Sequence, residues 1–181
     1  MSADDTSTPS AERLTLAQYV AALIETLGTH HPGALARMRL VVGALRARIT
    51  LDDETCEVYF GEEGLVVQPT NQTAAVDGEG STDSGAVLSL LDGYQEVAEA
   101  ILNGRLSVTG KAEHVVKMFI AIEILLDASP RTPALQSLAA RFHRERHGMS
   151  VLAESQGARR PSGSEAAEQA LLRRLGLLPN P

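Results

Sequence analysis

The spacing of hydrophobic residues changes along the chain and predicts where helices give way to strands. Apolar residues at helical spacing predict a first helix that begins near Leu16 and stops at Gly28. Thr15 and Gln18 fit a capping box at its start. Apolar and polar residues then alternate strictly from Leu45 to Leu51, which predicts a strand with one face on a core and the other in water.

Further strands follow this first one. A turn at Asp52–Glu54 leads into a second alternating segment, and the glycines of Gly61–Gly64 are typical of a hairpin connection to a third. Two shorter strands are predicted in addition to these three antiparallel strands. The five predicted strands lie at Leu45–Leu51, Cys56–Phe60, Leu65–Gln68, Thr73–Asp77 and Leu106–Gly110.

The second half of the chain returns to a helical pattern. We expect helices at Ala86–Leu91, at Gln95–Leu102 and at Ala112–Ala128, and another that Thr132 and Pro133 begin. Ten of the twelve residues from Val115 to Leu126 are apolar. A helix that is apolar nearly all round cannot keep one face in water, so it must be covered by the sheet and by something else.

Composition divides the chain into three parts. Residues 1–13 are polar and predict a disordered leader, and residues 14–148 hold all the strands and most of the helices. Residues 149–181 begin as a linker rich in Gly, Ser and Arg, and Ser164 fits the cap of a short extra C-terminal helix.

Composition also excludes several classes of protein. The formal net charge of −7 argues against a general nucleic-acid binder. The single cysteine, Cys56, excludes an intramolecular disulfide and a cysteine zinc site, so we expect a reducing, cytoplasmic location. Hydrophobic residues make up 44% of the chain and aromatic residues 3%, so the core must be aliphatic.

Charge is distributed unevenly. A basic run is followed at once by a run of acids, and we expect cross-strand pairs there instead of an anion site. The basic residues are Arg37, Arg39, Arg46 and Arg48, and the acids are Asp52, Asp53, Glu54, Glu57, Glu62 and Glu63. The segment Arg131–Arg160 has a local excess of arginine. A solvated helix face explains this excess better than transient contact with an anionic membrane surface, which stays open as the alternative.

The residues that could carry chemistry form no familiar constellation. His143 and His147 have the spacing of two metal ligands on a helix, but arginines flank them and the metalloprotease pattern fails, so we expect no metal. His114 begins the most apolar helix, and a structural role is favoured over that of a base. We expect neither a catalytic residue nor a cofactor.

A short motif before the apolar helix resembles a known family. Leu90-Leu91-Asp92-Gly93 is followed by a helix ending in Ala100-Ile101-Leu102, then by Asn103-Gly104-Arg105-Leu106-Ser107-Val108-Thr109-Gly110, and then by apolar residues from Val115. This order resembles the sterol carrier protein 2 (SCP2-like) domain over about Leu16–Ser129. Lys111 departs from the family, which often has Asp or Asn there.

The resemblance implies a fold and a ligand class. It implies the α/β (α+β) class, with a mixed five-stranded sheet covered on one side by helices and an apolar tunnel between them. SCP2-like domains bind sterols, fatty acyl chains and other lipids, and bacterial relatives include accessory proteins of isoprenoid quinone synthesis.

The apolar helix and the strand before it could fill a core or line such a cavity. Pockets for small molecules are mostly apolar, and methionine adapts to varied ligands. The expected lining residues, which would otherwise be ordinary core, are Leu88, Leu91, Leu106, Val108, Val115, Met118, Phe119 and Ile122.

Three functions are consistent with the sequence. The first is a non-catalytic carrier or presenter of an apolar small molecule, with residues Gly78–Gly85 as a gate. The second is an interaction module that pairs with a second copy, or with a biosynthetic enzyme, through the helix Val115–Leu126. The third is an enzyme that shapes a lipophilic substrate and uses His114, Tyr94 or Asp92.

Overall fold

The strands of the computed structural model, which describes residues 13–61, 64–70, 75–146 and 172–173, form one sheet. They are β1 (Arg46–Leu51), β2 (Glu54–Gly61), β3 (Gly64–Pro69), β4 (Gly78–Thr82) and β5 (Leu106–Gly110). Their order is β3-β2-β1-β4-β5. β1 and β4 are parallel, and the other neighbours are antiparallel. The predicted mixed five-stranded sheet is confirmed.

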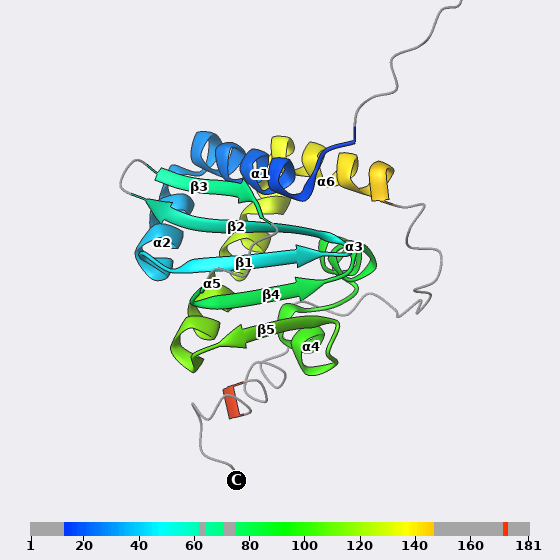
Figure 1. Cartoon of the computed structure of the whole chain (residues 1–181). Helices are drawn as coiled ribbons and strands as arrows, with labels where there is room; N and C mark the ends of the chain where they lie inside the picture. Colours follow the sequence, from blue (N-terminus) through cyan, green and yellow to red (C-terminus); the bar gives the residue numbers. More distant parts are fainter. Residues whose placement is uncertain (1–12, 62–63, 71–74, 147–171, 174–181) are drawn as a thin grey trace, which may run out of the picture.

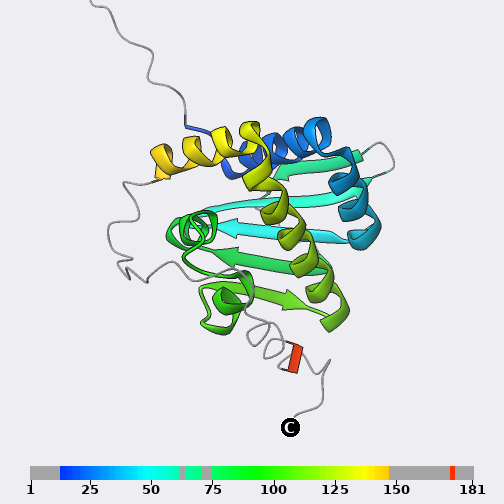
Figure 2. The same cartoon turned by 180° about the vertical axis from the view of Figure 1, so that it is seen from behind.

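Helices cover one face of this sheet. They are α1 (Leu16–His30), α2 (Pro32–Val42), α3 (Ser84–Leu91), α4 (Val97–Leu102), α5 (Ala112–Ala128), the short 3-10 helix η1 (Ser129–Arg131) and α6 (Pro133–Arg146). α1, α2, α5 and α6 lie behind the sheet in Figure 1 and in front of it in Figure 2. α3 and α4 pack at the end of the sheet where β1 and β4 stop and β5 starts. The predicted α+β class is therefore confirmed.

The capping box predicted at the first helix is present. The Thr15 side chain accepts a hydrogen bond from the backbone N–H of Gln18 at 3.3 Å, and the Gln18 side chain accepts one from the N–H of Thr15 at 2.8 Å. The helix continues past Gly28 to His30. α2 begins at Pro32 and was not predicted, because Met38 is its one fully buried residue and its apolar pattern is weak.

The fourth strand lies later in the chain than the sequence predicts. Of the strand expected at Thr73–Asp77, residues 73–74 lie outside the described residues and residues 75–77 form no strand. β4 spans Gly78–Thr82 and pairs with β1 on one side and β5 on the other. Gly78 lies so close to α5 that a Cβ built there would clash with the Met118 side chain. The gate expected at Gly78–Gly85 is therefore a paired inner strand followed by the buried start of α3.

α5 is covered by other helices as well as by the sheet, as its apolar sequence requires. Met38 of α2 and Leu27 of α1 form one core cluster with Ile124 of α5, so helices pack on α5 beside the sheet. Ile120 is still 37% exposed. Within the described residues, none of the helices has the length and hydropathy needed to cross a bilayer.

The helix-free face of the sheet carries one of the predicted cross-strand pairs, whereas Glu54 pairs with Arg146 instead. Arg48 contacts Glu57 of β2 at 3.2 Å and Glu79 of β4 at 2.6 Å, across both neighbouring strands. The Arg46 guanidinium lies 4.7 Å from the ring centre of Tyr59. The helix predicted after Ser164 lies outside the described residues, apart from residues 172–173, which are helical.

Candidate functional site

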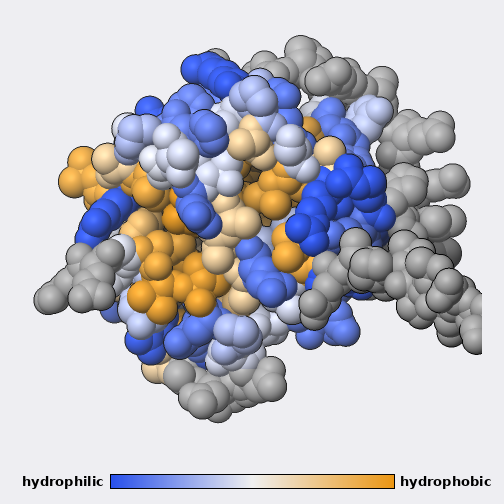
Figure 3. Space-filling view, turned by 90° about the horizontal axis from the view of Figure 1, so that it is seen from above, coloured by the Kyte–Doolittle hydropathy of each residue, from blue (hydrophilic) through white to orange (hydrophobic). Residues whose placement is uncertain are grey.

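An apolar cavity of about 210 Å³, partly open to solvent, lies between the helices and the sheet. α1 and α6 form much of its wall, and β1, β4, α3, the C-terminal end of α5 and η1 form the rest. Seen from the side of α1 and α6, hydrophobic residues show between the polar ones (Figure 3). The lining residues are Leu16, Tyr19, Val20, Leu23, Ile49, Leu51, Thr82, Val87, Leu91, Leu125, Leu126, Ser129, Leu135, Leu138, Ala139 and Phe142.

Helical spacing brings these side chains to the cavity. On α1 the lining residues recur every three or four positions from Leu16 to Leu23, and on α6 they do so from Leu135 to Phe142. Residues at these spacings share one face of a helix. Ile49 and Leu51 alternate on β1 and therefore point to the same side of the sheet. Each wall thus comes from the apolar face of an ordinary amphipathic element.

The lining carries no charged side chain among the described residues. Its polar atoms belong to Tyr19, Thr82 and Ser129. The Tyr19 hydroxyl donates to Glu145 at 2.9 Å, and the Thr82 hydroxyl donates to the backbone oxygen of Arg105 at 3.0 Å. These two donors are already engaged, so the cavity presents almost only hydrocarbon to a guest.

Two aromatic rings form one part of the wall. The rings of Tyr19 and Phe142 meet edge to face, with their centres 5.2 Å apart. Both side chains are 6% exposed. Edge-to-face contact is a preferred geometry for aromatic pairs. The contact therefore joins α1 to α6 beside the cavity.

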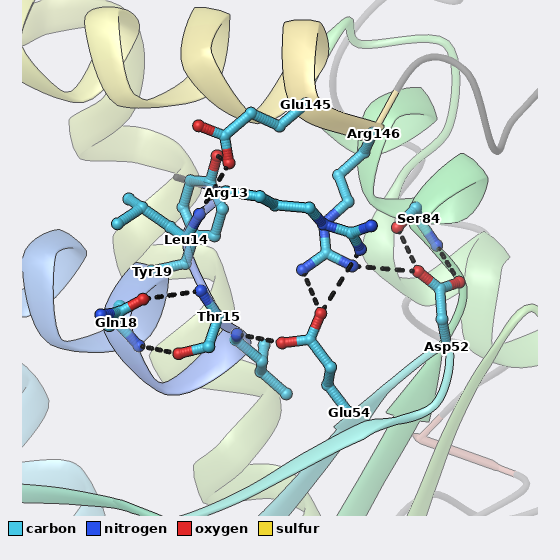
Figure 4. Close-up of polar contacts among 11 residues, drawn as sticks. Arg13, Leu14, Thr15, Gln18, Tyr19, Asp52, Glu54, Ser84, Glu145 and Arg146 are labelled. Carbon is cyan, nitrogen blue, oxygen red and sulfur yellow. Dashed lines mark hydrogen bonds and ion pairs between the residues drawn. The ribbon is translucent and has the colours of Figure 1, made fainter. Parts of the chain in front are cut away.

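A buried arginine lies at the same end of the molecule. Arg146, at the end of α6, is fully buried, and its Nη2 contacts a carboxylate oxygen of Glu54 at 2.6 Å (Figure 4). Its Nη1 lies 3.6 Å from a carboxylate oxygen of Asp52. Asp52 in turn accepts hydrogen bonds from the backbone N–H and the hydroxyl of Ser84. We call Arg146, Asp52, Glu54 and Ser84 the Arg146 cluster.

This cluster adjoins the cavity through two lining residues. The Arg146 guanidinium lies 5.8 Å from the ring centre of Phe142, and the backbone N–H of Leu16 donates to Glu54. Among the described residues, Nε and Nη1 of Arg146 make no hydrogen bond. Buried polar atoms without a partner are rare in proteins. Nη1 still faces the Asp52 carboxylate as an ion pair at 3.6 Å, so Nε is the atom of this guanidinium without a polar partner among the described residues.

Glu145 ties α1 to α6 beside this cluster. Its carboxylate accepts hydrogen bonds from the Leu14 backbone, the Tyr19 hydroxyl and the Arg141 side chain. Burial on its own would raise the pKa of Glu145, but the hydrogen bonds outweigh it and hold that pKa below its usual value. Burial, and then the bond to Glu145, raises the pKa of Tyr19 to about 12, so this phenol stays protonated.

The expected lining residues are spread over several places. Leu91 lines the cavity, and Leu88 lies in the core cluster next to it. Four others pack with α4 in a separate cluster: Leu106, Val108, Phe119 and Ile122. Val115 is buried, and Met118 packs over Gly78. Apart from Leu91, none of the eight lines the cavity found here, so their role as ligand contacts stays a prediction.

The residues considered for chemistry have structural partners. Nδ1 of His114 lies 3.1 Å from the backbone oxygen of Asp77, and Nε2 of His143 lies 3.0 Å from Asp92. His147, the second candidate metal ligand, lies outside the described residues. Cys56 is buried, and burial together with Glu54 raises the pKa of its thiol to about 11.

The sequence reasoning missed the walls that α1 and α6 provide. The signal was present, because both helices have apolar residues at three- and four-residue spacing. The spacing does not show which element the apolar face of each helix packs against. Arg146 was noted only as part of a basic segment, and nothing in its local sequence indicates that it is buried.

Comparison with known proteins gives similarity at the level of structure. No protein-family model matches the chain, and no curated protein matches it. A solved structure titled UbiJ-SCP2 ubiquinone synthesis protein is 19% identical, with 58% of this chain and 93% of that chain covered and a TM-score of 0.45. Apo sterol carrier protein 2 from Yarrowia lipolytica is 13% identical, with 61% and 92% covered and a TM-score of 0.44.

The sterol carrier protein domain 2 of Helicoverpa armigera is also similar. It is 13% identical, with 66% of this chain and 94% of that chain covered and a TM-score of 0.46. All three titles name the family that the sequence motif resembles. At these identities and scores the likeness assigns no ligand and no activity to this chain.

Proposed function

We propose that this protein binds a small apolar lipid in the cavity and carries or presents it without transforming it. The observation that supports this function is the cavity itself, about 210 Å³ in volume and lined almost wholly by hydrocarbon. An apolar guest that enters this partly open pocket buries its own surface against hydrocarbon side chains. The guest would lie between α1, α6 and the sheet.

The expected affinity suits a carrier. Burial of apolar surface contributes about 25 cal/mol for each Å², so a guest that buries about 250 Å² gains roughly 6 kcal/mol before the costs of association. Dissociation constants in the micromolar range or weaker follow from this. Binding of that strength is reversible, as release to a membrane or an enzyme requires.

Carriage is favoured over catalysis by the position of the polar groups. His114, Asp92 and Tyr94, which the enzyme hypothesis requires, do not line the cavity. His114 and Asp92 have hydrogen-bonding partners elsewhere. The Tyr19 and Thr82 hydroxyls that do line it already donate hydrogen bonds. A guest in the cavity therefore meets no reactive pair of groups among the described residues.

The first test looks for a bound lipid. Protein purified without detergent is extracted with organic solvent, and the extract is analysed by mass spectrometry. In parallel, an uncharged naphthalene dye whose fluorescence depends on polarity is titrated into the protein. We expect a copurified apolar compound or a saturable dye signal that apolar compounds displace, and the absence of both would contradict the proposal.

A matched pair of variants locates the site. Ala139 lines the cavity, whereas its neighbour Ala140 is exposed on the same helix. Ala139→Leu should fill part of the cavity, weaken dye binding at least tenfold and leave the thermal midpoint unchanged or higher. Ala140→Leu should change neither property. Equal dye binding by both variants would place the guest somewhere else.

A further inference from the structure

The backbone of β3 has an outer edge that no strand covers. β3 is the last strand of the sheet and pairs with β2 alone (Figure 1). The N–H of Thr70, one residue past the strand, donates to the backbone oxygen of Thr55 at 3.2 Å. In an antiparallel pair, residues that exchange hydrogen bonds alternate with residues that do not. Every second residue counted back from Thr70 therefore faces β2, and the backbones of Leu65, Val67 and Pro69 face outward.

This outer edge is apolar and carries no charge. Among the residues Gly64–Pro69 no side chain is charged, and three consecutive residues, 65–67, are apolar. Natural proteins protect edge strands from other chains with charges, bulges or proline. Pro69 protects the last outward position, but the N–H groups of Leu65 and Val67 make no hydrogen bond among the described residues. The side of the molecule on which β3 lies exposes hydrophobic surface (Figure 3).

The outward groups of this edge fit a second copy of the same edge. When two β3 strands lie antiparallel with Val66 opposite the partner's Val66, each Leu65 lies opposite the partner's Val67. These two residues then exchange both of their backbone hydrogen bonds, and the two such pairs give four bonds in all. Both outward N–H groups of each copy are used. The arrangement has twofold symmetry, which is the commonest symmetry of homo-oligomers.

The opposite edge of the sheet does not fit a second copy in this way. β5 is flanked by Arg105 and Lys111. Two β5 strands paired about Val108 would place Arg105 opposite the partner's Lys111, and like charges opposite each other destabilise a strand pair. The exposed side chains inside β5 are also polar, at Ser107 and Thr109. Charge and hydrogen bonding therefore favour β3 as the edge that pairs.

We propose that the protein forms a twofold-symmetric homodimer in which the β3 edges pair and the two sheets become one. Val66 lies opposite Tyr59 on the helix-free face, so the two Val66 side chains meet on that face and the helices of both copies cover the other. The interface is small, and we expect a dissociation constant in the micromolar range or weaker. Val66 does not line the cavity, so this inference stands apart from the proposed function.

Sedimentation equilibrium of the full chain over a range of concentrations measures the association. We expect a reversible monomer–dimer equilibrium. Val66→Lys and Val66→Glu each place two like charges on the symmetry axis and should weaken it at least tenfold, whereas a mixture of the two variants should form a heterodimer. Thr109→Lys, on the exposed part of β5, is the matched control and should associate like the wild type. A chain that stays monomeric up to about 1 mM, or dimers that the Val66 variants leave unchanged, would overturn the proposal.

Cysteine cross-linking tests the register of the two strands. Opposite residues of a non-hydrogen-bonded pair have Cα atoms about 4.5 Å apart, which a disulfide can span, so Val66→Cys should link two copies on mild oxidation. Gln68→Cys is the matched control, because in this register the two copies of residue 68 lie about 13 Å apart along the strands. The native Cys56 is buried and should not react. Equal linking of the two variants on a non-reducing gel, or no linking of Val66→Cys, would overturn the proposed pairing.

Discussion

At the scale of single residues, the buried Arg146 holds the positions of two helices, α1 and α3, through the carboxylates that it contacts. It neutralises Glu54, which holds the first turn of α1, and Asp52, which holds the first residue of α3. The two carboxylates would repel each other and would be partly buried without it. A single guanidinium therefore fixes α1 and α3 against the end of the β1–β2 hairpin.

Replacing this arginine should destabilise the fold strongly. Arg146→Met leaves two carboxylates without their cation, and we expect a loss of about 3 to 5 kcal/mol in the free energy of unfolding. Arg144→Met is the matched control, because Arg144 is exposed on the same turn of α6, and it should change stability by less than about 0.5 kcal/mol. Urea unfolding of both variants checks this, and similar losses would contradict it.

Glu145 predicts how stability depends on pH. Its pKa in the folded state is lowered, so it stabilises the protein above its unfolded pKa of about 4.3 and loses that effect as the pH falls through the folded value. Between about pH 5 and about pH 3 the wild type should lose more stability than the E145Q variant. E25Q, at an exposed position of α1, should follow the wild type. Parallel pH profiles for wild type and E145Q would contradict the prediction.

At the scale of elements, the strands with clear alternation were predicted well and β4 was not. β1 and β2 alternate apolar and polar residues, so the sequence indicates which of their residues face the core and which face solvent. β4 reads Gly-Glu-Gly-Ser-Thr, which is typical of a loop. It is a strand because β1 and β5 pair with it on both sides and because α5 packs over Gly78, where a larger residue would clash with Met118. Such tertiary contacts override local propensity.

Two glycines should respond in opposite ways to an added methyl group. Gly110 has a φ of +144°, and a Cβ there would lie 2.8 Å from the backbone oxygen of Asp77. Gly110→Ala should therefore destabilise the fold by at least about 1 kcal/mol. Gly33 lies in the first turn of α2 with open space around it, and Gly33→Ala should stabilise the fold by about 0.4 to 1 kcal/mol. Thermal unfolding of the two variants checks both signs.

The cavity shows where prediction from sequence reaches its limit. Its residues come from seven elements that span positions 16 to 142, so its position depends on how α1 and α6 pack together. The sequence indicated an apolar interior, and Leu91, one of the eight expected residues, lines the cavity, while its contact with a ligand stays a prediction. It directed attention to β5 and α5 because α5 is the most apolar helix, but the amphipathic helices line the largest part of the cavity.

At the scale of the whole molecule, the predicted division into residues 1–13, 14–148 and 149–181 stays a prediction that proteolysis can test. Brief treatment of the full chain with trypsin should cut first after Arg159, in the segment predicted to be a linker, because the bond after Arg160 precedes Pro161 and resists trypsin. Mass spectrometry of the early fragments identifies the cuts. First cleavage at Arg48 or Arg105, which lie in or beside the sheet, would contradict this division.

Residues at the end of α6 hold α1 in place. Leu14 donates its hydrogen bond to Glu145, 131 positions further along, and Glu54 meets Arg146 across 92 positions. During synthesis, the sheet strands leave the ribosome before Glu145 and Arg146, the residues that secure α1, do. The N-terminal helix can therefore dock in its final position, and the molecule can finish folding, only after almost the whole domain has emerged.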